Sequence, residues 1–349
     1  MTPLLLLLIF PVLLIIGVAY QTLGSWFDVR RFPPPGRMVE IGSCNLHLNR
    51  QGSGQPVVVL EAGIAATSIS WSLVQPRLAQ FCTVCSYDRA GLGWSSRRLN
   101  RPRHDRSPHE RARPCTLEQF VGELDALLRE ARLAAPFLLM GHSFGGLIVR
   151  AFARAYPERV AGLVLVEPVS LTFWGSGSQA NANLIRAGAK LSRRGAILAR
   201  FGVVRVALSA LDAGRQWFPK QIAQAAARQA TGELQNLARE VAKLPRELHS
   251  TVRAHWSRAG SILTLAEYLE ALPPCAAAGL TMSLPAEIPV TILSAENATA
   301  EELAERDAWA AQSLRGRHIK IPGTGHWLQL ERPDLVVDTV REMIGYTHR

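Results

Sequence analysis

The chain has 349 residues, of which 48% are hydrophobic, and its formal net charge is +11. This length suffices for one large α/β domain with an insertion, or for two small domains. The basic excess lies mostly in residues 97–114 and 169–285; because no nucleic-acid-binding motif accompanies it, we expect no nucleic-acid partner and favour an anionic membrane surface. Five cysteines do not make a disulfide framework, and the Cys82–Cys85 pair lies in a strand-like run, so we interpret these two as buried thiols.

The N-terminal segment is strongly apolar. Residues 3–20 carry no charge over 18 positions, which is just long enough to span a bilayer. No Lys or Arg precedes them, no clear cleavage site follows, and three arginines lie within residues 26–37. We therefore predict a single-pass anchor at residues 1–25 with the rest of the chain cytoplasmic, and a Pro-rich linker at 26–37. The alternative is a cleaved signal and a secreted or periplasmic protein.

Beyond the linker, short apolar runs alternate with helical patterns. Five runs predict buried strands, at residues 56–60, 81–87, 136–140, 161–166 and 289–293. Such alternation implies an α/β fold with a mostly parallel central sheet flanked by helices. It stops in residues 169–285, which are rich in Ala, Arg, Gln and Leu with helical periodicity. We predict a core formed by 38–168 and 286–349, with 169–285 as an inserted helical segment.

Residues 141–146 read Gly-His-Ser-Phe-Gly-Gly and lie between a strand-like run and a helical run. A serine on so sharp a turn has a strained backbone, and its flanking glycines avoid clashes with the strand and the helix. The pattern predicts that Ser143 is a nucleophile exposed at the carboxyl edge of the sheet. The backbone N–H of Phe144, at the helix start, is aimed at a developing oxyanion. The alternative is an ordinary glycine-rich connection with an incidental serine.

Four motifs in this order resemble the α/β-hydrolase superfamily. They are the Gly63-Ile64 turn after an early strand, the Asp88–Ser95 loop, the 141–145 turn, and Gly323-Thr324-Gly325-His326-Trp327 after the last strand. The resemblance implies an α/β-hydrolase fold in which 169–285 is a helical cap. It also implies an oxyanion hole formed by the backbone N–H groups of Ile64 and Phe144, with the Asp88–Ser95 loop as scaffold.

His326 is interpreted as the general base. The mechanism needs an imidazole that accepts the Ser143 proton and later passes it to the leaving group. A histidine on a glycine-flanked loop after the last strand can reach the serine turn. His142 is adjacent to Ser143, but consecutive side chains diverge, so we expect it to pack beside the site or tune it.

The acid that orients His326 departs from the commonest family pattern. Where the family most often shows Asp, after the penultimate strand, this chain has Ala298. Glu296 lies slightly earlier, and Glu167 ends the strand that follows the serine turn. Some family members take the acid from that second place, and we assign Glu167, with Glu296 as the alternative.

Together these features predict a membrane-anchored serine hydrolase that cleaves a carboxylic ester through an acyl-enzyme. The cap and anchor suggest a lipophilic small-molecule substrate, and we expect neither a metal nor a cofactor. One alternative is an amide or peptide hydrolase of the iminopeptidase type, against which the 14 basic and 6 acidic residues of segment 169–285 argue mildly. Another is a non-catalytic receptor on the same fold. A serine nucleophile argues against haloalkane dehalogenase and soluble epoxide hydrolase chemistry.

Overall fold

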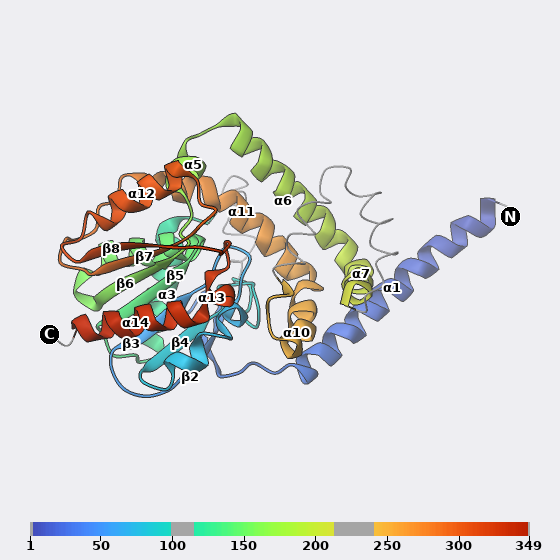
Figure 1. Ribbon diagram of the computed structural model, residues 1–349. Coiled ribbons are helices and arrows are strands. Elements are labelled where there is room, and N and C mark those ends of the chain that lie inside the picture. Colours follow the sequence, from blue (N-terminus) through green and yellow to red (C-terminus); the bar gives the residue numbers. More distant parts are fainter. Residues whose placement is uncertain (1–2, 99–114, 213–240, 348–349) are drawn as a thin grey trace. The chain divides into compact units, whose positions relative to one another are not determined.

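The computed structural model describes residues 3–98, 115–212 and 241–347 (Figure 1). The chain divides into two compact units. The first, called the helical unit, comprises Met1–Pro34 and Gly188–Ala266; the second, called the sheet unit, comprises Pro35–Ala187 and Glu267–Arg349. The N-terminal helix and most of the predicted insertion therefore share one unit.

One sheet organises the sheet unit. Its eight strands, counted over the described residues, follow the order β1-β2-β4-β3-β5-β6-β7-β8. Their bounds are β1 Arg37–Glu40, β2 Asn45–Gln51, β3 Val57–Glu61, β4 Thr83–Tyr87, β5 Phe137–His142, β6 Val160–Val166, β7 Val290–Ala295 and β8 Gly316–Ile321. Strand β2 pairs antiparallel with β1 and β4, and all other neighbouring pairs are parallel. The predicted mostly parallel sheet is confirmed.

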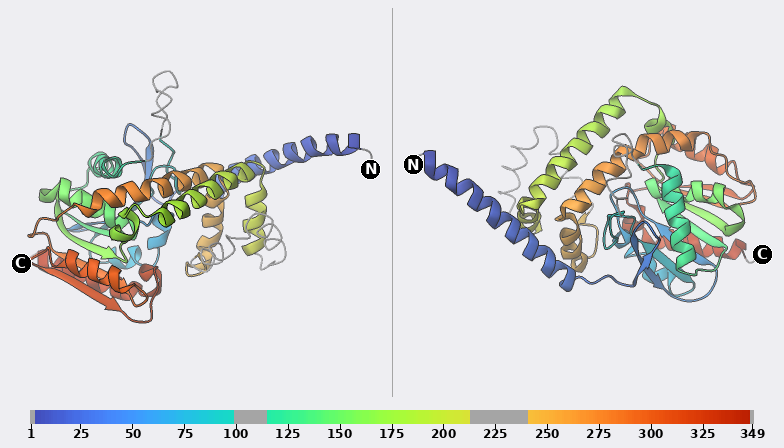
Figure 2. Two further views of the ribbon diagram at one scale, coloured as in Figure 1. Left: turned by 90° about the horizontal axis from the view of Figure 1, so that it is seen from above. Right: turned by 180° about the vertical axis from the view of Figure 1, so that it is seen from behind.

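Helices cover both faces of this sheet (Figures 1 and 2). The elements of one layer are η1 Ser68–Trp71, α2 Gln75–Leu78, α13 Leu328–Glu331 and α14 Pro333–Thr347. Those of the other are α3 Leu117–Glu130, α4 Phe144–Ala155 and α12 Ala300–Ala310. In the second layer, the guanidinium carbon of Arg150 on α4 lies 4.0 Å from the ring centroid of Trp309 on α12. The short elements η4 Pro157–Arg159 and α5 Leu171–Gly175 flank β6 in sequence.

The central strands are buried from end to end. All residues of β3, β4, β5 and β7 are buried, because these strands are covered on both faces, and most of their side chains are apolar. Cys82 and Cys85 are fully buried free thiols in this region, as predicted. Because the strands are parallel, the residues that follow β5, β6 and β7 emerge at one edge; they are Ser143, Glu167 and Glu296.

The helical unit contains α1 Pro3–Arg31, α7 Val203–Asp212 and α10 Arg246–Trp256, with parts of α6 Gln179–Arg200 and α11 Ala259–Leu280. The described residues of segment 169–285 are thus mainly helical. The expected linker at 26–37 is too long at its start, because α1 continues to Arg31. Pro11–Arg31 is long and apolar enough to cross a membrane, although a signal sequence would pass the same test.

The C-terminal half of α1 carries a polar face that packs within the helical unit. Arg205 of α7 is buried and donates from Nη1 to Asp28 Oδ2 over 2.7 Å. It also donates from Nε to Gln21 Oε1 over 3.1 Å and from Nη2 to Ser25 Oγ over 3.2 Å. Gln21 in turn donates to the carbonyl of Ser257 over 3.0 Å. One cation therefore ties three successive turns of α1 to α7.

Candidate active site

Ser143 stands on a sharp turn between β5 and α4. Its backbone is in a strained region, with φ 52° and ψ −120°, which side-chain-bearing residues rarely adopt. A Cβ on Gly141 would lie 2.5 Å from the Gly145 carbonyl oxygen, and one on Gly145 would lie 2.5 Å from that of Glu61. Only glycine fits at either position, so the strand–turn–helix geometry inferred from the sequence is present.

The Gly63-Ile64 turn lies directly against this serine. A Cβ added to Gly63 would be 3.0 Å from His142 Nδ1 and 3.5 Å from Ser143 Cβ. Phe144 is the first residue of α4, where a backbone N–H has no partner within the helix. The two predicted oxyanion donors, Ile64 and Phe144, therefore belong to segments that flank Ser143.

His326 lies beside the residue that precedes the serine. Its ring centroid is 4.8 Å from that of His142, and its carbonyl oxygen is 2.8 Å from His142 Nε2. Because a carbonyl only accepts, Nε2 of His142 carries the proton. Burial, with a smaller contribution from His326, holds the pKa of His142 well below its usual value. His142 is therefore a neutral, buried neighbour that fixes the backbone of the general-base candidate.

The loop that carries His326 is tied down by two carboxylates. Glu296 Oε2 accepts from the Gly323 backbone N–H over 2.6 Å, and Glu331 Oε2 accepts from that of Gly325 over 2.5 Å. Thr324 Oγ1 donates to the Ile321 carbonyl over 2.6 Å. The Glu296 side chain, the alternative acid, is thus engaged with the backbone of this loop.

Glu167 follows β6 with φ 44° and is buried. Its Oε1 lies 2.7 Å from Nη2 of Arg306, and its Oε2 accepts from the Ala295 backbone N–H. Burial raises the pKa of Glu167, and the Arg306 charge opposes that shift. Arg306 also donates to Ser294 Oγ over 3.0 Å and to the Pro168 carbonyl over 2.8 Å. The guanidinium thus links the ends of β6 and β7 and favours an ionised Glu167.

Two arginines contact these segments in ways that the sequence did not reveal, Arg306 and Arg89. Arg89 lies in the loop predicted to be scaffold, and it donates to successive carbonyls of the Gly63 turn. Asp88 confirms that scaffold role: it accepts from the Ser68 and Trp94 backbone N–H groups over 2.7 and 3.0 Å. Both arginines are visible in the sequence, one in a motif loop and one in the helical pattern after the penultimate strand, but the sequence alone does not indicate what each guanidinium reaches.

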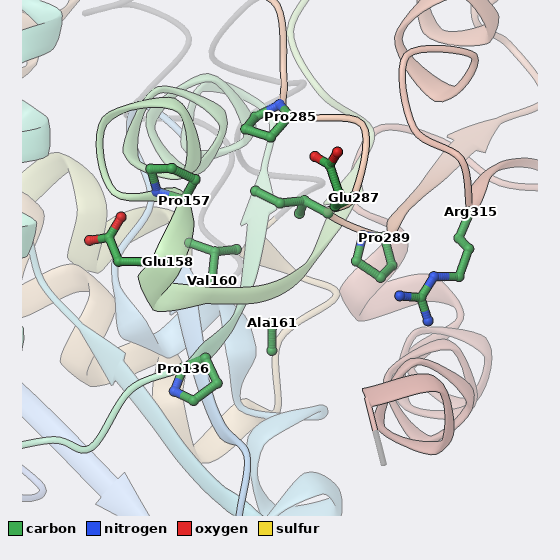
Figure 3. Close-up of a pocket in the computed structure, with 10 residues that line it drawn as sticks. Pro136, Pro157, Glu158, Val160, Ala161, Pro285, Glu287, Pro289 and Arg315 are labelled. Carbon is green, nitrogen blue, oxygen red and sulfur yellow. The ribbon is translucent and has the colours of Figure 1, made fainter. Parts of the chain in front are cut away.

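A shallow hollow lies at the opposite edge of the sheet (Figure 3). Its lining includes Pro136, Val160 and Pro289, which stand at the amino ends of β5, β6 and β7. Ligands of open α/β sheets bind at the carboxyl ends of strands, so we assign this hollow no part in the site around Ser143. Over the described part of the chain, no three His, Cys, Asp or Glu side chains gather as metal ligands would.

Comparisons with known proteins agree with this architecture. A sequence model of the alpha/beta hydrolase family matches residues 57–339. The 2-hydroxy-6-oxo-2,4-heptadienoate hydrolase of Pseudomonas putida is 33% identical over 141 residues, which cover 40% of this chain and 46% of that protein. Matches to the first curated relatives span only 32% to 46% of their lengths.

Solved structures match over a longer stretch. A thermophilic esterase from Thermogutta terrifontis superposes with a TM-score of 0.60 at 21% identity, covering 90% of this chain and 100% of the other. The epoxide hydrolase CorEH gives 0.58 at 19% identity, covering 88% and 98%. At such identities the similarity shows the shared fold alone.

Proposed function

Because this chain belongs to the α/β-hydrolase family, we propose that it is a serine hydrolase that cleaves a lipophilic carboxylic ester through an acyl-enzyme. The observation that carries the proposal is the strained Ser143 turn with the Gly63-Ile64 turn packed against it. A nucleophilic hydroxyl beside preorganised N–H donors is what acyl transfer requires. The fold by itself does not fix the reaction.

The proposed reaction has two similar halves. Ser143 Oγ attacks the ester carbonyl carbon while the His326 imidazole takes its proton, and the carbonyl π electrons move to the oxygen. The N–H groups of Ile64 and Phe144 bind that oxyanion. An electron pair on the oxyanion then reforms the carbonyl, the bond to the alcohol oxygen breaks, and His326 gives its proton to that leaving oxygen. Water attacks the acyl-enzyme by the same steps, releasing the acid and restoring the serine.

We assign Glu167 as the acid that orients His326. An ionised carboxylate is needed to hold the imidazole in the right tautomer and to stabilise the imidazolium. The Arg306 contact supports ionisation, and the two contacts of Glu167 leave carboxylate lone pairs that can accept a further hydrogen bond. Glu296 remains the alternative, since it contacts the backbone of the His326 loop.

Labelling with a fluorophosphonate probe tests this proposal. A nucleophilic serine displaces fluoride from phosphorus and stays covalently labelled, so the wild type should label and Ser143→Ala should not. Ser170→Ala is the matched control, because Ser170 Oγ caps α5 through the Phe173 N–H at the same edge of the sheet. Labelling that does not depend on Ser143 would leave the non-catalytic receptor as the better hypothesis.

Substrate class is tested in parallel. p-Nitrophenyl esters of graded acyl length should be hydrolysed faster as the chain lengthens. Aminoacyl amides should react much more slowly. If the amides are the better substrates while Ser143 still labels, the amide or peptide hydrolase replaces the esterase.

We also propose that α1 anchors the protein in a membrane as a single span, with the catalytic domain cytoplasmic. Its exposed apolar side chains, such as Leu13 and Ile15, support this. Deleting residues 1–18 removes this portion but keeps the polar face that binds Arg205, so the product should stay folded and leave the membrane fraction. Deleting 1–25 also removes Gln21 and Ser25, so this product should unfold at a lower temperature than the product that lacks residues 1–18. Sedimentation of both products with membranes would refute the anchor.

A further inference from the structure

Arg89 is a buried cation that directs all four of its Nη hydrogens to one stretch of backbone and one carboxylate. Nη1 donates to Glu61 Oε1 and to the Ala62 carbonyl, each over 2.6 Å. Nη2 donates to the Gly63 carbonyl and, over 3.1 Å, to the Ile64 carbonyl. Three successive carbonyls therefore converge on one guanidinium.

The Gly63 carbonyl shares its peptide group with the Ile64 N–H. A peptide bond is planar and trans, so its C=O and N–H point in opposite directions. A carbonyl held by Arg89 therefore fixes the Ile64 N–H on the side away from the guanidinium. The charge also polarises the peptide, since hydrogen-bonded groups in a buried setting strengthen one another. The Gly63 turn lies against Ser143, so this N–H belongs to a segment beside the nucleophile.

The same guanidinium also stands close to the other donor segment. Its central carbon lies 5.7 Å from the ring centroid of Phe144 and 5.4 Å from that of Tyr268. The Tyr268 hydroxyl donates to the Ala90 carbonyl over 2.7 Å, which fixes the backbone next to Arg89. Aromatic rings and a fixed neighbouring backbone thus hold the guanidinium in place while it donates hydrogen bonds to the Gly63 turn.

We propose that Arg89 is a positioning residue of the oxyanion hole: it aims and polarises the Ile64 N–H through the carbonyl of the same peptide group. The inference rests on the proposed serine hydrolase function. Arg89 does not touch the substrate. Its effect is on the stabilisation of the oxyanion in the transition state, so it acts on kcat and leaves substrate binding nearly unchanged.

Arg89→Lys is the informative variant. Lysine keeps the charge beside buried Glu61, so folding is preserved, but a single ammonium cannot reproduce the planar fork that binds several carbonyls. A donor displaced by about 1 Å can cost about 10²-fold, so we expect kcat for p-nitrophenyl butyrate to fall about 10²-fold with KM within about twofold. A change confined to KM, or an unchanged kcat, would overturn the proposal.

A matched variant separates this effect from a loss of packing. Arg98→Lys alters another arginine beside Tyr268, one that pairs with Glu123 over 2.8 Å. This variant should keep kcat within about threefold of the wild type; an equal loss in Arg98→Lys would assign the effect to general packing and overturn the proposal.

A readout independent of turnover distinguishes failure of the inference from failure of the proposed function. In protein labelled with 15N-isoleucine, the Ile64 amide proton should move upfield in Arg89→Lys, because its peptide loses polarisation, and should stay in place in Arg98→Lys. An unmoved Ile64 amide proton signal refutes the positioning role of Arg89 even if the enzyme hydrolyses esters. If the wild type neither reacts with the fluorophosphonate probe nor hydrolyses esters, the serine hydrolase proposal is refuted. The Ile64 chemical shift still tests whether Arg89 polarises this peptide.

Discussion

Replacement of Glu167 by glutamine is the sharpest test of the proposed triad. Glutamine keeps the shape of the side chain but removes its charge, so the imidazole loses its orienting carboxylate. In serine proteases, replacing the orienting aspartate by asparagine lowers kcat about 10⁴-fold, which corresponds to about 5 kcal/mol of transition-state stabilisation. We expect a loss of that order for Glu167→Gln and less than about threefold for Glu296→Gln, whose side chain is exposed.

The same replacement has a separate effect on stability. Arg306 is buried and would lose its charged partner, while its contacts with Ser294 and Pro168 persist. Breaking a buried ion pair costs about 3–5 kcal/mol, and we expect the lower end because the amide oxygen of glutamine can still accept one bond. Glu296→Gln should change the free energy of unfolding by no more than about 0.5 kcal/mol, since its amide oxygen can still accept from Gly323.

The assay therefore measures kcat for p-nitrophenyl butyrate together with urea unfolding. Asp125→Asn is the control. Asp125 is a buried acid on helix α3, and its replacement breaks another acid–arginine contact, the one with Arg159. That variant should lose stability without a comparable loss of kcat. If Glu296→Gln is the variant that loses activity, the acid follows β7 and the assignment is wrong. If neither does, the enzyme works as a dyad or is no enzyme.

Three further predictions follow from the geometry. His326→Ala should lower kcat as far as Ser143→Ala does, because members of a triad act as a unit; a residual rate near wild type would refute the base. Burial alone lowers the pKa of His47, but its hydrogen bond and charge contact with Asp88 outweigh this and hold the pKa above 6.5. The resulting stability is present below pH 6.5 and lost as pH rises through the raised pKa, so the urea-derived unfolding free energy should fall there in the wild type and not in His47→Gln. Gly122→Ala, with open space around its Cβ, should stabilise helix α3 by about 0.5–1 kcal/mol in thermal unfolding, and a loss of stability there would contradict the argument.

The parts of the fold set by local chemistry could be predicted from the sequence. The Ser143 turn was visible because its strain and its close backbone approaches demand glycine at fixed spacing. The central strands were visible because burial on both faces leaves a nearly unbroken apolar run, as in residues 57–60 of β3. These signals lie within a few residues of one another, so no tertiary information is needed to read them.

The partners of buried charges could not be predicted in this way. The contact between Glu167 and Arg306 joins residues 139 apart in sequence (306 − 167), and no spacing rule connects them. The packing of α1 against α7 could have been predicted more easily from the sequence. Gln21, Ser25 and Asp28 recur at helical spacing and so mark one polar face. The unbroken apolar stretch before them drew the interpretation toward an anchor that ends at residue 25.

The cysteines give the chain a practical property for chemical labelling. Burial raises the pKa of all five thiols, to about 11 for Cys82 and about 12 for Cys85 and Cys275. Thiolate, the form that reacts with maleimides, is therefore scarce at neutral pH in the folded protein. A single cysteine introduced on an exposed helix position, such as Gly122, would carry a fluorophore with little background from the native thiols. Site-specific fluorescent labelling therefore needs no prior removal of the native cysteines.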